Sequence, residues 1–220
     1  MRAAIVSGGT LDEAFASGFI RNWGPDHLIA ADLGLYYCRE MGLTPDHIVG
    51  DFDSLPAGEK LPEGPGVDVR TFRPEKDDTD TSIAAELAVE LGADEIVFLG
   101  ATGTRLDHVL ANIGVMCALS RKGIRAQILD AHNRISVLLP SGNERAHITI
   151  TKSGQYGKYV SFAPFGGPVR DLSLTGFKYP LHSRTVGSSD AQFLTSNEIA
   201  DDEAVVSFSA GELLMIESRD

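Results

Sequence analysis

Two aspartates separated by one residue, Asp51 and Asp53, are the first side chains whose types and spacing suggest chemistry. In an extended segment, residues i and i+2 project to the same side of the backbone. Two carboxylates placed in this way suit a hard divalent cation that prefers oxygen ligands, such as Mg²⁺. Aspartate and serine are also common in solvated turns, so the pair taken alone favours an ordinary turn.

A second acidic cluster covers residues 75–80 and ends in Asp80. One interpretation is a helix start, where the helix dipole favours acidic side chains. The other interpretation is that Asp80 joins Asp51 and Asp53 around one metal ion. Carboxylates about 4 Å apart repel by about 4 kcal/mol per pair at an effective dielectric of about 20. Convergence of the three therefore requires a cation or raised pKa values, and a metal is the simpler explanation.

A glycine-containing loop over residues 100–108 could hold phosphate groups. Gly100 and Gly103 permit close approach of the backbone, and the helix expected after the loop attracts anions at its first turn. Arg105 adds a fork of donors that matches phosphate oxygens. The sequence has neither a Walker A motif nor a GxGxxG motif. A plain turn with a surface arginine is the alternative interpretation.

The elements that would position these residues alternate between apolar runs and helical patterns over the first 130 residues. This alternation predicts a mainly parallel sheet with helices on both faces. Ligands of such sheets bind beyond the carboxyl ends of the strands, where the acidic residues and the glycine loop fall. Thr79 or Asp80 is expected to cap the third helix. The predicted strands cover 3–7, 27–31, 47–49, 67–72, 95–99 and 124–129, and the helices cover 11–23, 33–41, 81–91 and 106–122.

The pattern changes after about residue 130, where short strand candidates are separated by glycine and proline. No segment there has a helical stripe, and this spacing predicts a β-sandwich. The expected fold class is therefore α/β: an N-terminal, mainly parallel, doubly wound sheet domain over 1–130, followed by a C-terminal all-β sandwich domain over 131–220. The strand candidates are 135–139, 147–151, 159–163, 169–174, 192–194, 204–209 and 213–217.

The composition restricts the class of partner. The chain has 220 residues and a formal net charge of −12, which argues against nucleic acid or an anionic membrane surface as the main partner. A bound cation would still allow a phosphate ligand. Two separated cysteines indicate core thiols in a reducing cytosol. No apolar stretch approaches the roughly 20 residues that span a bilayer, and no signal peptide is expected, so a cytoplasmic protein is predicted.

Six segments taken in order resemble the thiamin pyrophosphokinase family, and together they span nearly the whole chain. The resemblance implies an α/β domain followed by a β-sandwich, and a homodimer with composite active sites. It also implies that the enzyme transfers the terminal pyrophosphoryl unit of ATP to the hydroxyl of thiamin, which releases AMP. The segments are 31–34 (ADLG), 50–54 (GDFDS), 76–80 (KDDTD), 100–112, 176–180 (GFKYP) and 195–198 (TSNE).

The resemblance also implies roles for individual residues. The Mg²⁺ ligands would be Asp32, Asp51, Asp53 and Asp80. Catalysis would fall to Asp51, Asp53, Asp80, Arg105 and Asp107. ATP would be bound by Asp32, Lys76, Thr102, Gly103, Arg105 and His108, and thiamin by Tyr179, Ser196 and Asn197.

This sequence departs from the family at a few of these positions. The family often has glycine where Leu33 stands and usually has glycine where Thr104 stands, which puts the backbone contacts of Thr104 with phosphate in question. Some relatives carry tryptophan at the position of Tyr179. No general base can be assigned from the sequence, although Asp107 and His108 are candidates.

Other functions remain open. A nucleotide-sugar glycosyltransferase or a nucleotidyltransferase would explain Asp51 and Asp53, but would leave segments 76–80 and 195–198 unexplained. A non-catalytic sensor of nucleotide or thiamin is a second alternative, although binding alone rarely needs so many carboxylates. A partner-binding role for the residues after 130 is a third. Formation of AMP from ATP and thiamin separates the enzyme from each alternative.

Overall fold

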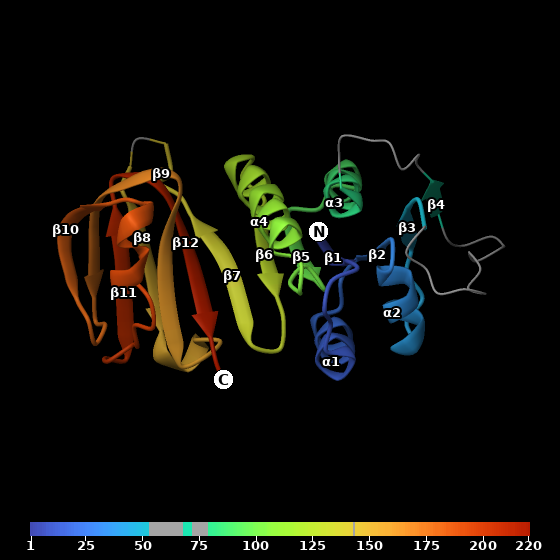
Figure 1. The fold of residues 1–220 in the computed structure, drawn as a ribbon, viewed down its shortest axis with the longest axis horizontal. Helices are drawn as coiled ribbons and strands as arrows, with labels where there is room; N and C mark the ends of the chain where they lie inside the picture. The colour runs from blue at the N-terminus through green and yellow to red at the C-terminus, as the bar shows by residue number, and fades with distance from the viewer. Residues whose placement is uncertain (53–67, 72–78, 143) are drawn as a thin grey trace. The chain divides into compact units, whose positions relative to one another are not determined.

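The computed structural model describes residues 1–52, 68–71, 79–142 and 144–220. The chain divides into two compact units, Met1–Ala131 and His132–Asp220, coloured blue to green and yellow to red in Figure 1. Asp53 and Lys76, two residues of the predicted site, lie outside the described residues. The mixed α/β architecture expected from the sequence is confirmed.

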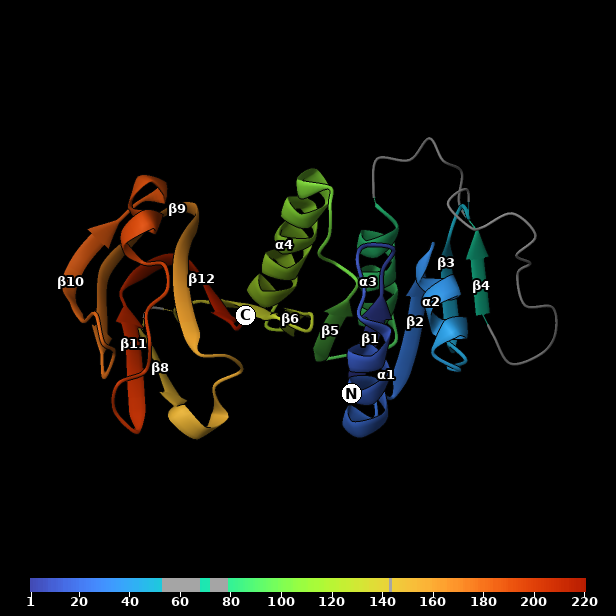
Figure 2. The same ribbon diagram turned by 60° about the horizontal axis from the view of Figure 1, so that its bottom comes forward.

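The first unit is built on parallel strands in the order β4-β3-β2-β1-β5-β6. β1 lies between β2 and β5, as Figure 2 shows, so the chain reverses its direction across the sheet at this point. Ligands of open parallel sheets bind at such a reversal. The strands are β1 (Arg2–Val6), β2 (His27–Ala31), β3 (His47–Gly50), β4 (Asp68–Thr71), β5 (Glu95–Leu99) and β6 (Arg125–Leu129).

Helices cover both faces of this sheet. Figure 1 shows α1 (Glu13–Trp23) and α2 (Gly34–Glu40) on one side, and α3 (Asp80–Glu90) and α4 (Leu106–Arg121) on the other. Right-handed crossovers produce this arrangement when strand order reverses beside β1. Because both faces are covered, the central strands are apolar on both sides, and the last four residues of β1 and of β5 are fully buried.

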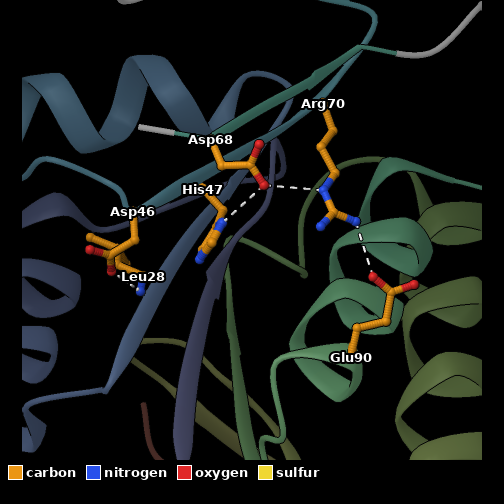
Figure 3. Close-up of polar contacts among 6 residues, drawn as sticks. All are labelled: Leu28, Asp46, His47, Asp68, Arg70 and Glu90. Carbon is orange, nitrogen blue, oxygen red and sulfur yellow. Dashed lines mark hydrogen bonds and ion pairs between the residues drawn. The ribbon is translucent and has the colours of Figure 1, made fainter. Parts of the chain in front are cut away.

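The edge strand β4 is fastened to α3 by a chain of polar contacts (Figure 3). Arg70 donates from Nε to Asp68 Oδ2 at 3.2 Å and from a terminal nitrogen to Glu90 Oε2 at 3.0 Å. His47 Nδ1 lies 3.5 Å from the same Asp68 oxygen. The Arg70 side chain lowers the pKa of Asp68, with a smaller contribution from His47. Because Arg70 and its partners are partly exposed, these ion pairs align β4 more than they stabilise it.

The second unit consists of antiparallel strands in the order β7-β12-β9-β11-β8, with β10 paired to β9. Its core includes Phe162 and Phe177, which meet edge to face with ring centroids 5.6 Å apart. The strands are β7 (Asn133–Leu138), β8 (Ala146–Thr151), β9 (Tyr159–Thr175), β10 (Leu181–Val186), β11 (Glu203–Phe208) and β12 (Ala210–Ser218).

Parts of the strand prediction for this unit are wrong. The two strands expected over 159–163 and 169–174 form one strand of 17 residues, β9. Gly166 has φ of 71°, so the chain bends there without ending the strand. The strand expected over 192–194 is absent, since a 3₁₀ helix covers Ser188–Phe193. Strand β10 was not predicted. No helix among the described residues is long and apolar enough to cross a membrane.

Candidate active site

A pocket of about 500 Å³ lies in the first unit at the carboxyl ends of β1, β2 and β5. It is lined by the last residue of β2 and the residues that follow the three strands, together with the first residues of α3 and part of α4; the strand-end segments are 7–10, 31–33 and 100–105. The pocket therefore sits where the strand order reverses, the position that the parallel sheet predicts for a ligand. The predicted site residues that it collects are Asp32, Asp80, Thr102, Gly103, Arg105 and His108.

The loop after β1 and the loop after β5 are joined along their backbones. The N–H of Gly9 donates to the carbonyl of Gly100 at 2.7 Å, and that of Thr10 donates to Thr102 at 2.8 Å. A Cβ atom on Gly9 would lie 2.2 Å from the Thr102 oxygen and 2.4 Å from the Gly100 oxygen. Only glycine at position 9 allows this approach, so the junction between these two pocket-lining loops depends on it.

Residues 7–10 have no site role among those expected from the sequence. The available signal was a pair of glycines directly after a predicted buried strand, the same arrangement that drew attention to Gly100 and Gly103. Gly100 itself has φ of 63°, and a Cβ atom there would lie 2.4 Å from the carbonyl oxygen of Ser7. Each loop therefore requires glycine because of the other loop.

Three hydrogen bonds fix the helices that border the pocket. The Thr81 hydroxyl donates to Ser7 Oγ at 2.9 Å in a buried position, which ties α3 to the end of β1. Thr79 caps α3 by accepting from the N–H of Ser82, which confirms one of the two caps expected from the sequence. On the other side, Asn112 of α4 donates to the carbonyl of Ala101 at 2.8 Å. Asn112 also lines the pocket, and sequence reasoning gave it no separate role.

Arg105 precedes α4 and lines the pocket, while Asp107 lies in the first turn of the same helix. The guanidinium donates to both carboxylate oxygens of Asp107, at 2.6 and 3.3 Å. This contact with Arg105 lowers the pKa of Asp107 to about 2 and raises the pKa of Arg105. Asp107 is not part of the pocket lining, so its visible role is to hold Arg105.

Asp32 follows β2 directly and adopts a left-handed backbone conformation, with φ of 50°. Aspartate tolerates this conformation better than most residues, and such backbones are common at functional sites. Its N–H donates to the carbonyl of Val49 at 2.8 Å, which links the ends of β2 and β3. Two residues later, a Cβ atom on Gly34 would lie 1.9 Å from the Val6 oxygen, so α2 starts directly against β1.

The four predicted metal ligands are only partly brought together. Asp32 and Asp80 line one pocket, whereas Asp51 follows β3 and is not in that lining. Asp53 lies outside the described residues. Within the part of the chain that the structure describes, no three His, Cys, Asp or Glu side chains lie close enough to hold an ion. Mg²⁺ usually keeps waters and uses one or two carboxylates plus phosphate oxygens, so the pair in the pocket fits that ion.

The residues expected to contact thiamin belong to the second unit. The Tyr179 side chain is largely exposed, and the structure places it beside Asn197, which is buried. Ser196 is exposed, with φ of 58°, and its N–H donates to Ser161 Oγ at 2.9 Å. The neighbouring Glu198 pairs with Lys178 at 2.9 Å, which lowers the pKa of this glutamate.

Comparisons with known proteins follow the same division of the chain. The model of the "Thiamin pyrophosphokinase, catalytic domain" matches residues 24–128, and that of the "Thiamin pyrophosphokinase, vitamin B1 binding domain" matches residues 145–213. A thiamine pyrophosphokinase of Bacillus subtilis (strain 168) is 33% identical over 195 residues, which is 87% of each chain.

Solved structures give the same result for the fold. The crystal structure of thiamine pyrophosphokinase from Bacillus subtilis is similar with a TM-score of 0.83 and 29% identity over the full length of both chains. That of thiamin pyrophosphokinase from Geobacillus thermodenitrificans has a TM-score of 0.78 and 33% identity, and covers 100% of this chain and 98% of the other.

Proposed function

This chain belongs to the thiamin pyrophosphokinase family and is an enzyme of that type, and we propose that it converts ATP and thiamin into AMP and thiamin diphosphate. The observation that carries the proposal is the pocket at the carboxyl ends of β1, β2 and β5, where interlocked glycine loops, Arg105 and two carboxylates meet. The match of both family models to this one chain supports the pairing of an ATP site with a thiamin site.

The triphosphate of ATP is proposed to lie in this pocket. The loop over 100–105 brings backbone groups close to the ligand, and the first turns of α3 and α4 favour negative charge. Arg105 supplies a planar pair of donors for phosphate oxygens. The proposed ATP-binding residues are those predicted from the sequence: Asp32, Lys76, Thr102, Gly103, Arg105 and His108.

Asp32, Asp51, Asp53 and Asp80 are proposed to hold Mg²⁺ together with the phosphates. When bound, this ion neutralises charge on the phosphate oxygens during transfer. The support is the pair Asp32 and Asp80 at one pocket that also carries a cationic Arg105. The protein itself contributes by holding the triphosphate in one orientation for the reaction.

The proposed reaction is an in-line displacement at the β-phosphorus. The hydroxyl oxygen of thiamin forms a bond to this phosphorus, the bond from it to the α,β-bridging oxygen breaks, and AMP leaves with that oxygen. The hydroxyl proton passes to a base. Since Asp107 has a pKa of about 2 and is paired with Arg105, it is a poor proton acceptor. His108 lines the pocket and is the better placed of the two candidate bases.

Thiamin is proposed to bind in the second unit, at the segments that carry Tyr179, Ser196 and Asn197. An exposed tyrosine ring offers an aromatic face to the cationic thiazolium ring of thiamin. The finer fold description is also a proposal: a doubly wound domain over 1–130 that binds ATP and Mg²⁺, and a β-sandwich over 131–220 that binds thiamin. The parallel pairing of β1–β6 and the antiparallel pairing of β7–β12 support it.

The protein is proposed to act as a homodimer with composite active sites. Leu106 and Leu110 are exposed one turn apart on α4, beside the pocket residues Arg105 and His108, and a second copy would bury them. A cytoplasmic location is proposed because Cys38 and Cys117, both described, are buried and form no disulfide. The net charge of −12 argues against nucleic acid as a partner.

The test is an incubation with ATP, thiamin and Mg²⁺, followed by separation of the nucleotides. We expect AMP and thiamin diphosphate in equal amounts, and no AMP when thiamin is omitted. Formation of ADP would indicate transfer of a single phosphoryl group and would contradict the proposal. Saturable binding of ATP or thiamin without turnover would favour a sensor instead.

A further inference from the structure

The side-chain amide of Asn197 is engaged on both sides by the backbone of Tyr179. Its oxygen accepts from the N–H of Tyr179 at 3.0 Å, and its nitrogen donates to the carbonyl of Tyr179 at 2.8 Å. The same oxygen also accepts from the N–H of Glu198 at 2.9 Å. One side chain therefore pairs with Tyr179 as a neighbouring strand would.

Most of the hydrogen-bonding capacity of the Asn197 amide is already used within the protein, which leaves little for a ligand. An amide oxygen has two acceptor positions, and both are occupied here. One of the two amide hydrogens is also used, and Asn197 is only 4% exposed. Tyr179, by contrast, is 59% exposed, so the side chain available to a substrate is the tyrosine.

The surroundings of the pair hold both partners in place. The backbone of Asn197 exchanges hydrogen bonds with Val160 of β9, at 2.8 and 3.1 Å. Lys178 donates from its backbone to the carbonyl of Glu198 and from its side chain to the carboxylate, both at 2.9 Å. Pro180 restricts the backbone of the residue before it, Tyr179, to extended conformations. The tyrosine thus projects from a segment whose backbone has little freedom.

We propose that Asn197 is a positioning residue that fixes the backbone of Tyr179 and so presents the aromatic ring to thiamin, without touching thiamin itself. This inference rests on the proposed function, in which Tyr179 contacts the substrate. It replaces the direct contact expected for Asn197 from the sequence with an indirect role. Loss of the amide would then act on thiamin through the tyrosine ring alone.

A double-mutant cycle on Asn197 and Tyr179 tests this inference. Tyr179→Ala should raise the KM for thiamin by roughly tenfold, the size expected when one aromatic contact with a cation is lost, with the KM for ATP unchanged. Asn197→Asp keeps an acceptor but opposes a carboxylate oxygen to the Tyr179 carbonyl. In the otherwise wild-type protein, Asn197→Asp should raise the KM for thiamin by about threefold or more. In the Tyr179→Ala variant, the same substitution should raise this KM by less than about 1.5-fold. Since an added negative charge would attract cationic thiamin, charge alone cannot cause this increase.

Equal effects of Asn197→Asp in both backgrounds would show a direct contact with thiamin and would overturn the inference. Asn197→Ala, which leaves two backbone groups of Tyr179 without this partner, provides the same comparison if the aspartate variant does not fold. Val206→Ala, a change in the fully buried core of β11, is the control for a general loss of stability. It should lower the melting temperature and leave the KM for thiamin unchanged.

A readout independent of activity follows the ring itself. With Trp23→Phe, the only tryptophan of the chain is removed, and Tyr179→Trp then places a single reporter at position 179. Asn197→Asp should lower the fluorescence anisotropy of this reporter, and an unchanged anisotropy would contradict the positioning role. Wild-type enzyme that forms no AMP would instead refute the proposed function, so the two failures are distinguishable.

Discussion

The guanidinium of Arg105 donates two hydrogen bonds to the carboxylate of Asp107 at the start of α4, beside the pocket. Arg105 is 68% exposed, so its side chain can exchange this carboxylate for a phosphate group without unfolding the helix. The pair therefore holds the arginine side chain in one orientation beside the pocket. In the proposed function, a phosphate group of ATP would compete with this carboxylate for the same pair of guanidinium donors.

The pairing predicts how activity depends on pH. The pKa of Asp107 in the folded protein is about 2, below its ordinary value of 3.8. The ion pair with Arg105 is therefore fully formed above pH 3.8 and is lost as the pH falls through the folded-state pKa of about 2. We expect the pH profile of kcat/KM between pH 5 and 9 to keep its shape in Asp107→Asn, while the KM for ATP changes. Loss of the acidic limb of the profile in this variant would identify Asp107 as the general base instead.

The hydrogen-bonded loops after β1 and β5 predict that a substitution at Gly9 weakens ATP binding, whereas the same substitution at Gly18 does not. Gly9→Ala should separate the loops after β1 and β5 and raise the KM for ATP by roughly tenfold or more, because its Cβ would overlap two carbonyl oxygens. Gly18→Ala on α1 is the control, because a Cβ atom there would meet nothing within 4 Å beyond its own stretch of helix; it should stabilise the protein by about 0.5–1 kcal/mol. Denaturant unfolding and ATP kinetics check both variants. Equal ATP affinity in the two variants would refute the proposed role of the junction between the loops after β1 and β5.

The buried bond between Thr81 and Ser7 predicts a stability effect at the base of α3. Thr81→Val should lower the free energy of unfolding by about 1–3 kcal/mol, because Ser7 is left without its donor in a buried place. Combining it with Ser7→Ala removes both partners, and the double variant should be no less stable than Thr81→Val alone. Denaturant titration measures both. Full additivity of the two losses would show that the bond contributes nothing.

The proposed metal site predicts different consequences for two acidic residues on one helix. Asp80→Asn should lower kcat by more than about tenfold with the melting temperature retained, since it removes a ligand from the pocket. Glu86→Gln, on the exposed side of α3, removes an acidic charge from the same helix and should leave kcat unchanged.

Asp51→Asn should also lower turnover by more than about tenfold. Near-normal turnover in Asp51→Asn would remove that residue from the metal site.

Local patterns in the sequence were sufficient for much of the first unit. Apolar runs followed by helical stripes predict β1 to β6 and α1 to α4 within a few residues, and the polar Thr79 before a helix predicts its cap. These features depend on neighbours in sequence, which propensities and capping rules describe. The same is true of the glycine loop after β5.

The features that local sequence patterns did not predict depend on contacts between segments far apart in the chain. Position 9 requires glycine because Gly100 and Thr102 approach it from about 90 residues away, as the backbone bonds show. The engagement of the Asn197 amide by Tyr179 depends on a turn between β9 and β10, and strand β10 itself was not predicted. Likewise β9 continues past its glycines because it pairs with β12 along one part and with β10 and β11 along another.

Isotopic labelling of the phosphorus atoms of ATP tests the proposed pyrophosphoryl transfer directly. With ATP radiolabelled at the β-phosphorus, incubation with thiamin and Mg²⁺ should place the label in thiamin diphosphate, while label at the α-phosphorus should appear in AMP. Label from the γ-phosphorus in thiamin monophosphate, with the β-label retained in ADP, would contradict attack at the β-phosphorus and with it the proposed transfer of a pyrophosphoryl group.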